Sequence, residues 1–168
     1  MAFIVRPEHP NDFAAIRAVH QTAFGRQSEG KLVDALRSQG YARLSLVAEE
    51  ESQVVGHILF SDLDIVGQRA TVAGLALAPL AVIPGCQRQG IGSALVREGL
   101  RRSVDQGHRI VLVVGHPAYY PRFRFSAQLA KALTSPYAGD SFIALELVPS
   151  ALQGVSGEVR YPEPFAAI

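Results

Sequence analysis

The chain has 168 residues, of which 48% are hydrophobic, and its 16 Lys and Arg against 15 Asp and Glu leave a formal net charge of +1. This length suits one domain with a full core, so we expect a single domain over residues 1–168. The nearly balanced charge gives no electrostatic footprint for nucleic-acid binding. The single Cys86 excludes an internal disulfide framework.

The beginning of the chain, Met-Ala-Phe-Ile-Val-Arg-Pro, lacks the long apolar stretch of a signal peptide. The most apolar run, near residues 72–83, is short and is interrupted by Gly74 and Pro79. We therefore expect a cytoplasmic protein without a membrane partner.

The first forty residues predict one strand and two amphipathic helices. A short strand over residues 3–6 is closed by Pro7, and Asn11 or Asp12 offers an N-cap for the first helix. Gly25 breaks this helix, Ser28 offers a second cap, and Gly40 ends the second helix.

The junction between the two helices, residues 25–31, imitates the phosphate-binding loop G-x-x-x-x-G-K. It has Leu32 where that loop needs the Ser or Thr that holds magnesium, and a helix rather than a strand precedes it. A nucleotide triphosphatase is therefore disfavoured.

The remaining elements predict a mixed α/β sheet. Strand candidates at residues 44–49, 54–65 and 72–82 form successive antiparallel hairpins. A helix opened by glycines ends at Gly107, and the uniformly apolar residues 110–114 are expected to be a covered central strand in a parallel pair. A late strand over residues 142–147 completes the sheet.

Residues 80–95 are the most informative stretch, because a predicted strand ending at Val82 meets a helix opened by Gly90 and Gly92. Glycine lets backbone N–H groups approach a ligand, and a helix start favours phosphate oxygens. Arg88 adds a full charge beside these groups. The stretch predicts a pyrophosphate site, although an ordinary turn before a helix has the same letters.

A Rossmann dinucleotide site fits this stretch poorly. Leu95 occupies the third glycine position of G-x-G-x-x-G, and the next strand ends at residues 113–116 without the acidic residue that binds ribose.

Two motifs resemble the GCN5-related N-acetyltransferase (GNAT) superfamily. The spacing Gln87-x-x-Gly90-x-Gly92 after a strand is similar to the acetyl-CoA motif of that family. Residues 119–125, Tyr-Tyr-Pro-Arg-Phe-Arg-Phe, resemble its Tyr-x-x-x-Gly-Phe signature, with Arg124 where glycine is usual. The order of the predicted elements matches along nearly the whole chain.

This resemblance implies a single-domain acyl-CoA N-acyltransferase-like fold, with a mostly antiparallel sheet, a parallel central strand pair and flanking helices. It implies an N-acetyltransferase that moves an acetyl group from acetyl-CoA to a primary amine by direct attack in a ternary complex. The acceptor would be a small molecule or a peptide, and the family is compatible with a homodimer.

The resemblance also assigns the cofactor site. In the family the strand matching residues 77–82 is bulged, and the pantetheine arm lies beside it, so the main chain of Leu80 and Val82 would bind that arm. A free N–H at such a bulge can also face a developing oxyanion. The phosphates would lie on the stretch that follows, namely on Gln87, Arg88, Gln89, Gly90, Gly92 and Ser93.

Tyr120 matches the usual general acid of the family. A phenol with a reference pKa near 10 is protonated at neutral pH, but a thiol near 8.5 is the stronger acid. The thiolate must therefore be met at close range, or the pKa of the phenol must be lowered. An aromatic core patch is the alternative reading, and a left-handed backbone at Arg124 would cost more than at glycine.

The general base is the least determined residue, because residues 72–82 lack the Asp or Glu that many family members place there. We rank Glu29 first, since the first helical pair of the family borders the acceptor pocket. Its alternative role is to favour its own helix N-terminus. The other candidates are His57, Asp62, Asp64 and His116.

A ping-pong route through Cys86 is disfavoured, because no His or Asp lies at a local spacing that signals an activated thiol. No pattern requires a metal. A non-catalytic CoA-binding or sensing domain on the same scaffold is the main alternative function, and an unrelated structural domain is the third.

Overall fold

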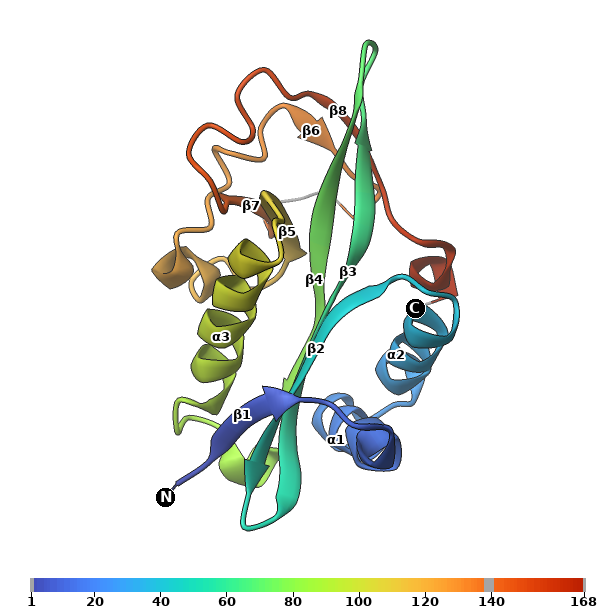
Figure 1. Cartoon of the computed structure of the whole chain (residues 1–168), viewed down its shortest axis with the longest axis vertical. Coiled ribbons are helices and arrows are strands. Elements are labelled where there is room, and N and C mark those ends of the chain that lie inside the picture. Colours follow the sequence, from blue (N-terminus) through green and yellow to red (C-terminus); the bar gives the residue numbers. More distant parts are fainter. Residues whose placement is uncertain (1, 138–140, 168) are drawn as a thin grey trace.

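The computed structural model describes residues 2–137 and 141–167, and its eight strands form one sheet (Figure 1). The main path of the sheet runs β1-β2-β3-β4-β5-β7, and β8 pairs with both β3 and β6. Every pair is antiparallel except β4–β5 and β6–β8. The strands are β1 Ile4–Pro7, β2 Ala42–Glu50, β3 Gln53–Val66, β4 Thr71–Val82, β5 Ile110–Val114, β6 Leu133–Thr134, β7 Phe142–Glu146 and β8 Gly157–Arg160.

The helices cover the two faces of this sheet. Figure 1 shows α3 Ile91–Asp105 on one face, with α1 Phe13–Phe24 and α2 Ser28–Ser38 on the other. Short 3-10 turns occur at Pro10–Asp12, Pro84–Cys86, Tyr120–Phe123 and Glu163–Ala167. The predicted fold class, with a parallel pair formed by the strand before and the strand after α3, is confirmed.

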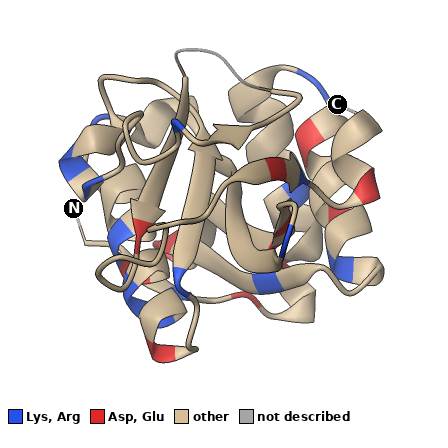
Figure 2. Cartoon of the chain, turned by 90° about the horizontal axis from the view of Figure 1, so that it is seen from above, with Lys and Arg blue, Asp and Glu red and all other residues tan. Residues whose placement is uncertain are grey.

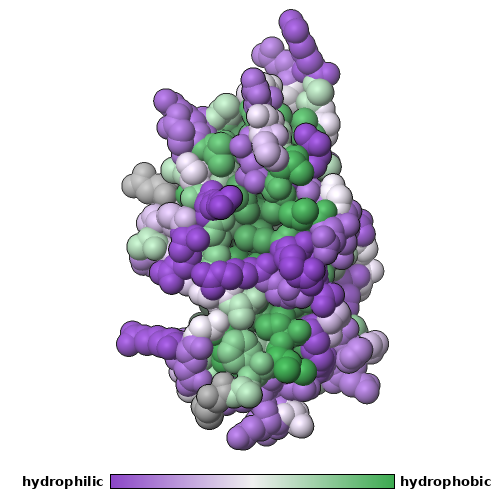
Figure 3. Space-filling view, turned by 60° about the vertical axis from the view of Figure 1, so that its left-hand side comes forward, coloured by the Kyte–Doolittle hydropathy of each residue, from purple (hydrophilic) through white to green (hydrophobic). Residues whose placement is uncertain are grey.

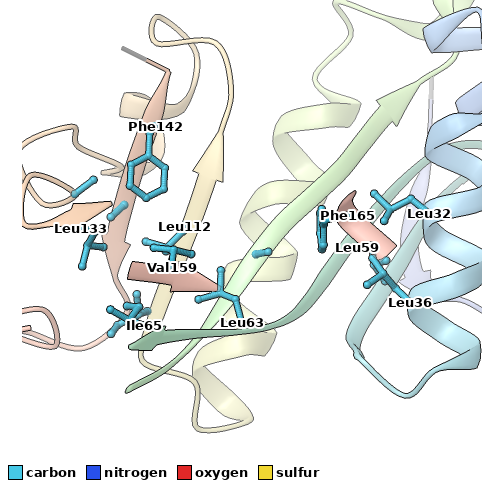
Figure 4. Packing of buried hydrophobic residues seen from close by; sticks show 14 of the residues in the cluster. Leu32, Leu36, Leu59, Leu63, Ile65, Leu112, Leu133, Phe142, Val159 and Phe165 are labelled. Atoms are coloured by element: carbon cyan, nitrogen blue, oxygen red, sulfur yellow. The ribbon is translucent and has the colours of Figure 1, made fainter. Parts of the chain in front are cut away.

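Each face of the sheet has its own hydrophobic core, because neighbouring residues of a strand point to opposite faces. Ala76 and Leu112 belong to the core under α1 and α2, whereas Leu77 and Val113 belong to the core under α3. Figure 4 shows Phe165, near the C-terminus, lying close to Leu32, Leu36 and Leu59, so the end of the chain closes the first core.

Two predicted N-caps differ in detail from the structure. Asp12 precedes α1 but makes no capping hydrogen bond to it, because its carboxylate instead accepts bonds from the His9 N–H and from Arg6. Ser28 is the first residue of α2, and Gln27 holds the cap position without a side-chain bond. The predicted breaks at Gly25 and Gly107 are confirmed, since both adopt a positive φ.

The helices and strands carry charged residues of both signs. Figure 2 shows Lys and Arg interspersed with Asp and Glu around the molecule. Several of these charges are paired along α3, where Glu98 accepts hydrogen bonds from Arg101 and Arg102. Among the described residues, no helix combines the length and apolarity needed to cross a bilayer.

Candidate active site

The parallel strands β4 and β5 separate after a short ladder. Their register consists of Leu75 with Val111 and Ala76 with Leu112, and the pairing ends there within the described residues. On the other side of β4 the register with β3 shifts, because Ile58 pairs with Leu80 and Phe60 pairs with Leu77. Three steps on β4 therefore face two on β3, which is a β-bulge. The bulge predicted for residues 77–82 is present.

Leu80 and Val82, predicted to bind the cofactor arm through the main chain, lie beyond this bulge on the part of β4 that has left β5. Val82 also receives a hydrogen bond at its carbonyl from the Gln87 side chain, at 2.9 Å. Gln87 thus braces the loop between β4 and α3, a role that the motif alone did not indicate.

The loop before α3 presents several backbone donors. Gly90 is the N-cap of α3 with φ 86°, in the left-handed region that favours glycine. In the described part of the chain, the N–H groups of Arg88, Gln89 and Gly90 donate to no protein acceptor. These amides, the positive end of α3 and the exposed Arg88 fit a pyrophosphate group.

Gly92 and Ser93 lie in the first turn of α3, and Tyr119 closes over them. The Ser93 hydroxyl lies 3.1 Å from the Tyr119 hydroxyl. A Cβ at Gly92 would lie 3.4 Å from the same Tyr119 oxygen and 3.8 Å from Cγ2 of Val82. The start of α3 is therefore a close junction between β4 and the segment that follows β5.

Tyr120 has a different environment from that of its neighbour. It is 8% exposed, and its ring packs against Tyr119, Phe123 and Phe125. The ring also lies on Gly115, where any Cβ would collide with it. Burial raises the pKa of Tyr120 well above its ordinary value, and Tyr119 adds to the effect. The pKa of Tyr120 is thus raised and not lowered, so a role as proton donor would require close contact with the thiolate.

The turn after Tyr120 keeps the shape that glycine would favour. Arg124 has φ 74° and is exposed, and its N–H bonds to the carbonyl of Pro121 at 2.9 Å. The departure from the family signature therefore places an arginine in a left-handed conformation without changing the turn.

A cavity of about 300 Å³ opens where β4 and β5 separate. Its walls come from both strands and from the aromatic side chains of Tyr137, Tyr161 and Phe165. Arg26, at the junction of α1 and α2, adds a charge to an otherwise mostly apolar lining. The lining residues are Arg26, Ala76, Leu77, Ala78, Leu112, Val113, Val114, Tyr137, Tyr161 and Phe165.

Glu29 lies beside this cavity through its partner Arg26. The carboxylate of Glu29 is buried, and it accepts bonds from Arg26 Nε at 3.0 and 3.1 Å and from Nη2. Burial is the largest influence on the pKa of Glu29, and it raises that pKa. The hydrogen bonds from Arg26 and from the Glu29 backbone, together with the charges of Arg26 and His20, outweigh it, so the pKa lies below the ordinary value. Glu29 is consequently a paired carboxylate and a weak base by itself.

The other base candidates are dispersed. Asp62 is half-buried and bound to Arg43, and Asp64 is exposed on β3. His116 follows β5 and accepts a bond from the Ala118 N–H at 3.2 Å, which fixes the turn before Tyr119. His57 is fully buried in β3 beside His20, a contact for which the sequence offered no signal.

Cys86 lies in the 3-10 turn before α3. Burial raises the pKa of its thiol, and the charge of Glu50 acts in the same direction. A raised pKa disfavours the thiolate that a nucleophilic role requires.

One face of the molecule has both hydrophobic and hydrophilic areas. Figure 3 shows two areas of hydrophobic surface separated by a band of hydrophilic side chains. Val104 and Val114, each 45% exposed, are among the large hydrophobic residues that reach the solvent.

A mixed sheet that forks between its parallel strands, with a glycine-opened helix at the fork, defines the class of acyl-CoA-dependent N-acyltransferases. The model of the acetyltransferase (GNAT) family matches residues 13–123. The chain belongs to this family.

Related proteins agree with this placement. The chain is 37% identical over 165 residues to the uncharacterized N-acetyltransferase YhbS of Escherichia coli K12, covering 96% of this chain and 98% of that protein. The structure of Escherichia coli YhbS in complex with CoA is similar, with a TM-score of 0.90 and 36% identity, covering 98% of this chain and 92% of that one. A GNAT acetyltransferase from Brucella melitensis in complex with acetyl-CoA has a TM-score of 0.83 and 38% identity, covering 98% of each chain.

Proposed function

We propose that this protein transfers an acetyl group from acetyl-CoA to a primary amine by direct attack in a ternary complex. The observation that carries the proposal is the cavity at the fork of β4 and β5. The loop before α3 lies at the end of β4 beyond this fork, and Arg26 and Phe165 approach from the elements of the opposite face. Two substrates entering from the two faces would meet between the separated strands.

The residues that would hold acetyl-CoA are those of β4 and the start of α3. The amides of Arg88, Gln89 and Gly90, with Gly92, Ser93 and the charge of Arg88, suit the pyrophosphate. The main chain of Leu80 and Val82 lies along the separated part of β4 and suits the pantetheine arm. The structures of YhbS with CoA and of the Brucella protein with acetyl-CoA support this assignment. When bound, acetyl-CoA supplies the acetyl group as a thioester.

The protein side of the reaction has four parts. The apolar walls of the cavity exclude water and favour the neutral form of the acceptor amine over the ammonium form. Backbone N–H groups at the bulge of β4 face the developing oxyanion. The Tyr120 hydroxyl gives its proton to the departing sulfur, and Glu29, held by Arg26 at the cavity, orients the acceptor or a water that receives its proton.

The test is an acceptor screen. The protein is incubated with acetyl-CoA and a panel of aliphatic, aromatic and amino-acid amines, while free CoA and product mass are followed. We expect CoA release to match the appearance of one acetylated amine. Binding of acetyl-CoA without release of CoA from any amine would favour a CoA-binding domain without catalysis.

The intact mass of the protein decides between direct attack and a ping-pong route. After incubation with acetyl-CoA alone, the intact mass of the protein should be unchanged. A gain of one acetyl group on Cys86 would contradict direct attack.

A further inference from the structure

A line of hydrogen-bonded, buried polar side chains runs from α1 across β3 and β2 to Glu8. His20 of α1 and His57 of β3 are both fully buried, and Nε2 of His20 lies 2.8 Å from Nδ1 of His57. Nε2 of His57 lies 2.7 Å from the hydroxyl of Ser45 in β2, and this hydroxyl donates to the carboxylate of Glu8. The Glu8 side chain is 15% exposed, so the line connects the interior to the solvent.

The outer end of this line fixes the position of every proton along it. Glu8 accepts two hydrogen bonds from Arg37, one on each carboxylate oxygen and each at 2.8 Å, so both of its oxygens are acceptors. Ser45 must give its proton to Glu8, so it accepts one from His57 Nε2. A neutral His57 then has an unprotonated Nδ1, which accepts the Nε2 proton of His20. The remaining nitrogen, Nδ1 of His20, must carry a lone pair.

This last nitrogen is both buried and unpartnered. In the described part of the chain, Nδ1 of His20 has no hydrogen-bond partner. Burial lowers the pKa of His20 to about 4, and it lowers that of His57 well below the ordinary value, so both rings are neutral at pH 7. A buried polar atom without a partner is uncommon in native proteins, and a catalytic role is one physical reason for it.

The inner end of the line belongs to α1, and His20 lies one helical turn before that helix ends. The charge of Glu29 acts on His20, and His20 acts on Glu29 in return, so the two groups are neighbours electrostatically. Arg26, bound to Glu29, lines the cavity between β4 and β5. His20 and Glu29 thus belong to the two helices that meet at Arg26, beside the cavity.

We propose that His20, His57 and Ser45 form a buried proton path that carries the acceptor's proton from the Glu29 side of the cavity to Glu8 at the surface. The proposal rests on the proposed function. In this proposal a connected line of groups, and not a single carboxylate, removes the proton of the acceptor.

The transfer balances at each atom. The acceptor N–H bond breaks, and its proton passes by an oxygen of Glu29, or by a water bound there, to Nδ1 of His20. His20 gives its Nε2 proton to Nδ1 of His57, and His57 gives its own Nε2 proton to the Ser45 oxygen. Ser45 gives its original proton to Glu8, which releases it to solvent. The reverse transfer restores the line when the products have left and the inner end meets water.

Charged groups act on both histidines of this line. Arg37 and Asp12 act on His57 from the Glu8 side, and Glu29 acts on His20 from the cavity side. Asp34 shares Arg37 with Glu8 but makes no contact with the line. Asp34 therefore provides a matched control for the loss of a carboxylate beside Arg37.

The first test compares Glu8→Gln with Asp34→Asn, using acetyl-CoA and the amine that the acceptor screen identifies. Gln has the size of Glu and keeps one acceptor oxygen, so this variant should remain folded. We expect Glu8→Gln to lower kcat by about 10-fold or more, with an altered pH profile and an unchanged KM for acetyl-CoA. Asp34→Asn should leave the kinetics and pH profile unchanged.

Equal kcat and pH profiles for Glu8→Gln and the parent would overturn the proton path while leaving the acetyltransferase function intact. A parent that acetylates no amine would overturn the proposed function itself, and the path with it. The two failures are therefore separate results.

The second test needs no acceptor. Nitrogen-15 NMR of the histidine rings at pH 7 should show both His20 and His57 protonated at Nε2 and unprotonated at Nδ1. A proton on Nδ1 of His20 would contradict the orientation of the line, whatever the kinetics show.

Discussion

At the scale of single residues, Tyr119 and Tyr120 show how adjacent identical side chains are given different tasks. The Tyr119 hydroxyl reaches Ser93 at the start of α3, and Arg122 lies 4.5 Å over its ring centre. Tyr120 is buried in the aromatic group beside Gly115, in the core under α3. Tyr120 is thus held by packing within the core, whereas the Tyr119 hydroxyl reaches the start of α3.

We expect Tyr120→Phe to reduce kcat by about 100-fold or more while leaving acetyl-CoA affinity nearly unchanged, since it removes one proton donor and little apolar area. Tyr119→Phe is the matched control, and it should affect acetyl-CoA binding more than kcat because Tyr119 contacts the start of α3. The measurement is kcat with the identified acceptor when chemistry limits the rate. Equal kcat for Tyr120→Phe and the parent would reject the assignment.

Glu29→Gln separates a catalytic from a structural carboxylate. If Glu29 receives or relays the acceptor's proton, the acidic limb of kcat/KM against pH should be lost or should shift upward in the variant. Because the folded pKa of Glu29 lies below its unfolded value, its ionised form stabilises the fold above the unfolded pKa, and this stabilisation is lost as pH falls through the folded pKa. A purely structural Glu29 would cost about 0.3–1 kcal/mol at the helix N-terminus. In that case the pH profile, measured with one acceptor for both proteins, would not change.

The cofactor residues could be proposed from the sequence because they are close together in it. Gln87, Gly90 and Gly92 lie within six positions, so one loop places them. The contact between His20 and His57 could not be proposed, because 37 positions separate a helix residue from a strand residue and no motif joins them. Only the packing of α1 on β3 brings the two rings together.

At the scale of elements, the long apolar segments were predictable and the short pairings were not. Residues 110–114 were expected to be a covered strand, and Ile110–Val113 are buried within it. β6 and β8 contain two and four residues, and β8 is held by pairing with β3 almost a hundred positions earlier. A strand of that length has too little periodicity of its own to be recognised.

The turn after Tyr120 gives a prediction about stability. Arg124 is exposed with φ 74°, a conformation that costs a non-glycine residue free energy. We expect Arg124→Gly to raise the free energy of unfolding by about 0.5–1 kcal/mol in urea titrations. Arg122→Gly, in the 3-10 turn just before it, should instead destabilise the protein. A loss of stability in Arg124→Gly would mean that the Arg124 side chain contributes more than its backbone costs.

At the scale of the whole molecule, the two buried histidines connect stability to pH. The folded pKa of His20 is about 4 and its unfolded value is 6.5, so between these values the unfolded chain binds more protons. The free energy of unfolding should therefore fall as pH decreases from 6.5 toward 4. His20 alone would contribute roughly 3 kcal/mol over that range.

Urea titrations between pH 7 and pH 4.5 measure this slope. His20→Gln should flatten it, because the variant lacks the buried ring that the unfolded chain protonates more readily. An unchanged slope in His20→Gln would show that the buried pair does not control the acid sensitivity of the fold.

The binding of acetyl-CoA should be visible in the stability of the whole protein, because a ligand that binds only the folded state stabilises it by mass action. At a concentration 100 times Kd the stabilisation is about 2.7 kcal/mol, which for a chain of this size raises Tm by about 5–10 °C. Gly92→Val should abolish this shift, since the branched side chain fills the space between Tyr119 and Val82 at the proposed phosphate site. Ala94→Val adds a similar side chain further into the same helix and should retain the shift. If Gly92→Val keeps the full shift in Tm, the phosphates bind somewhere other than the start of α3.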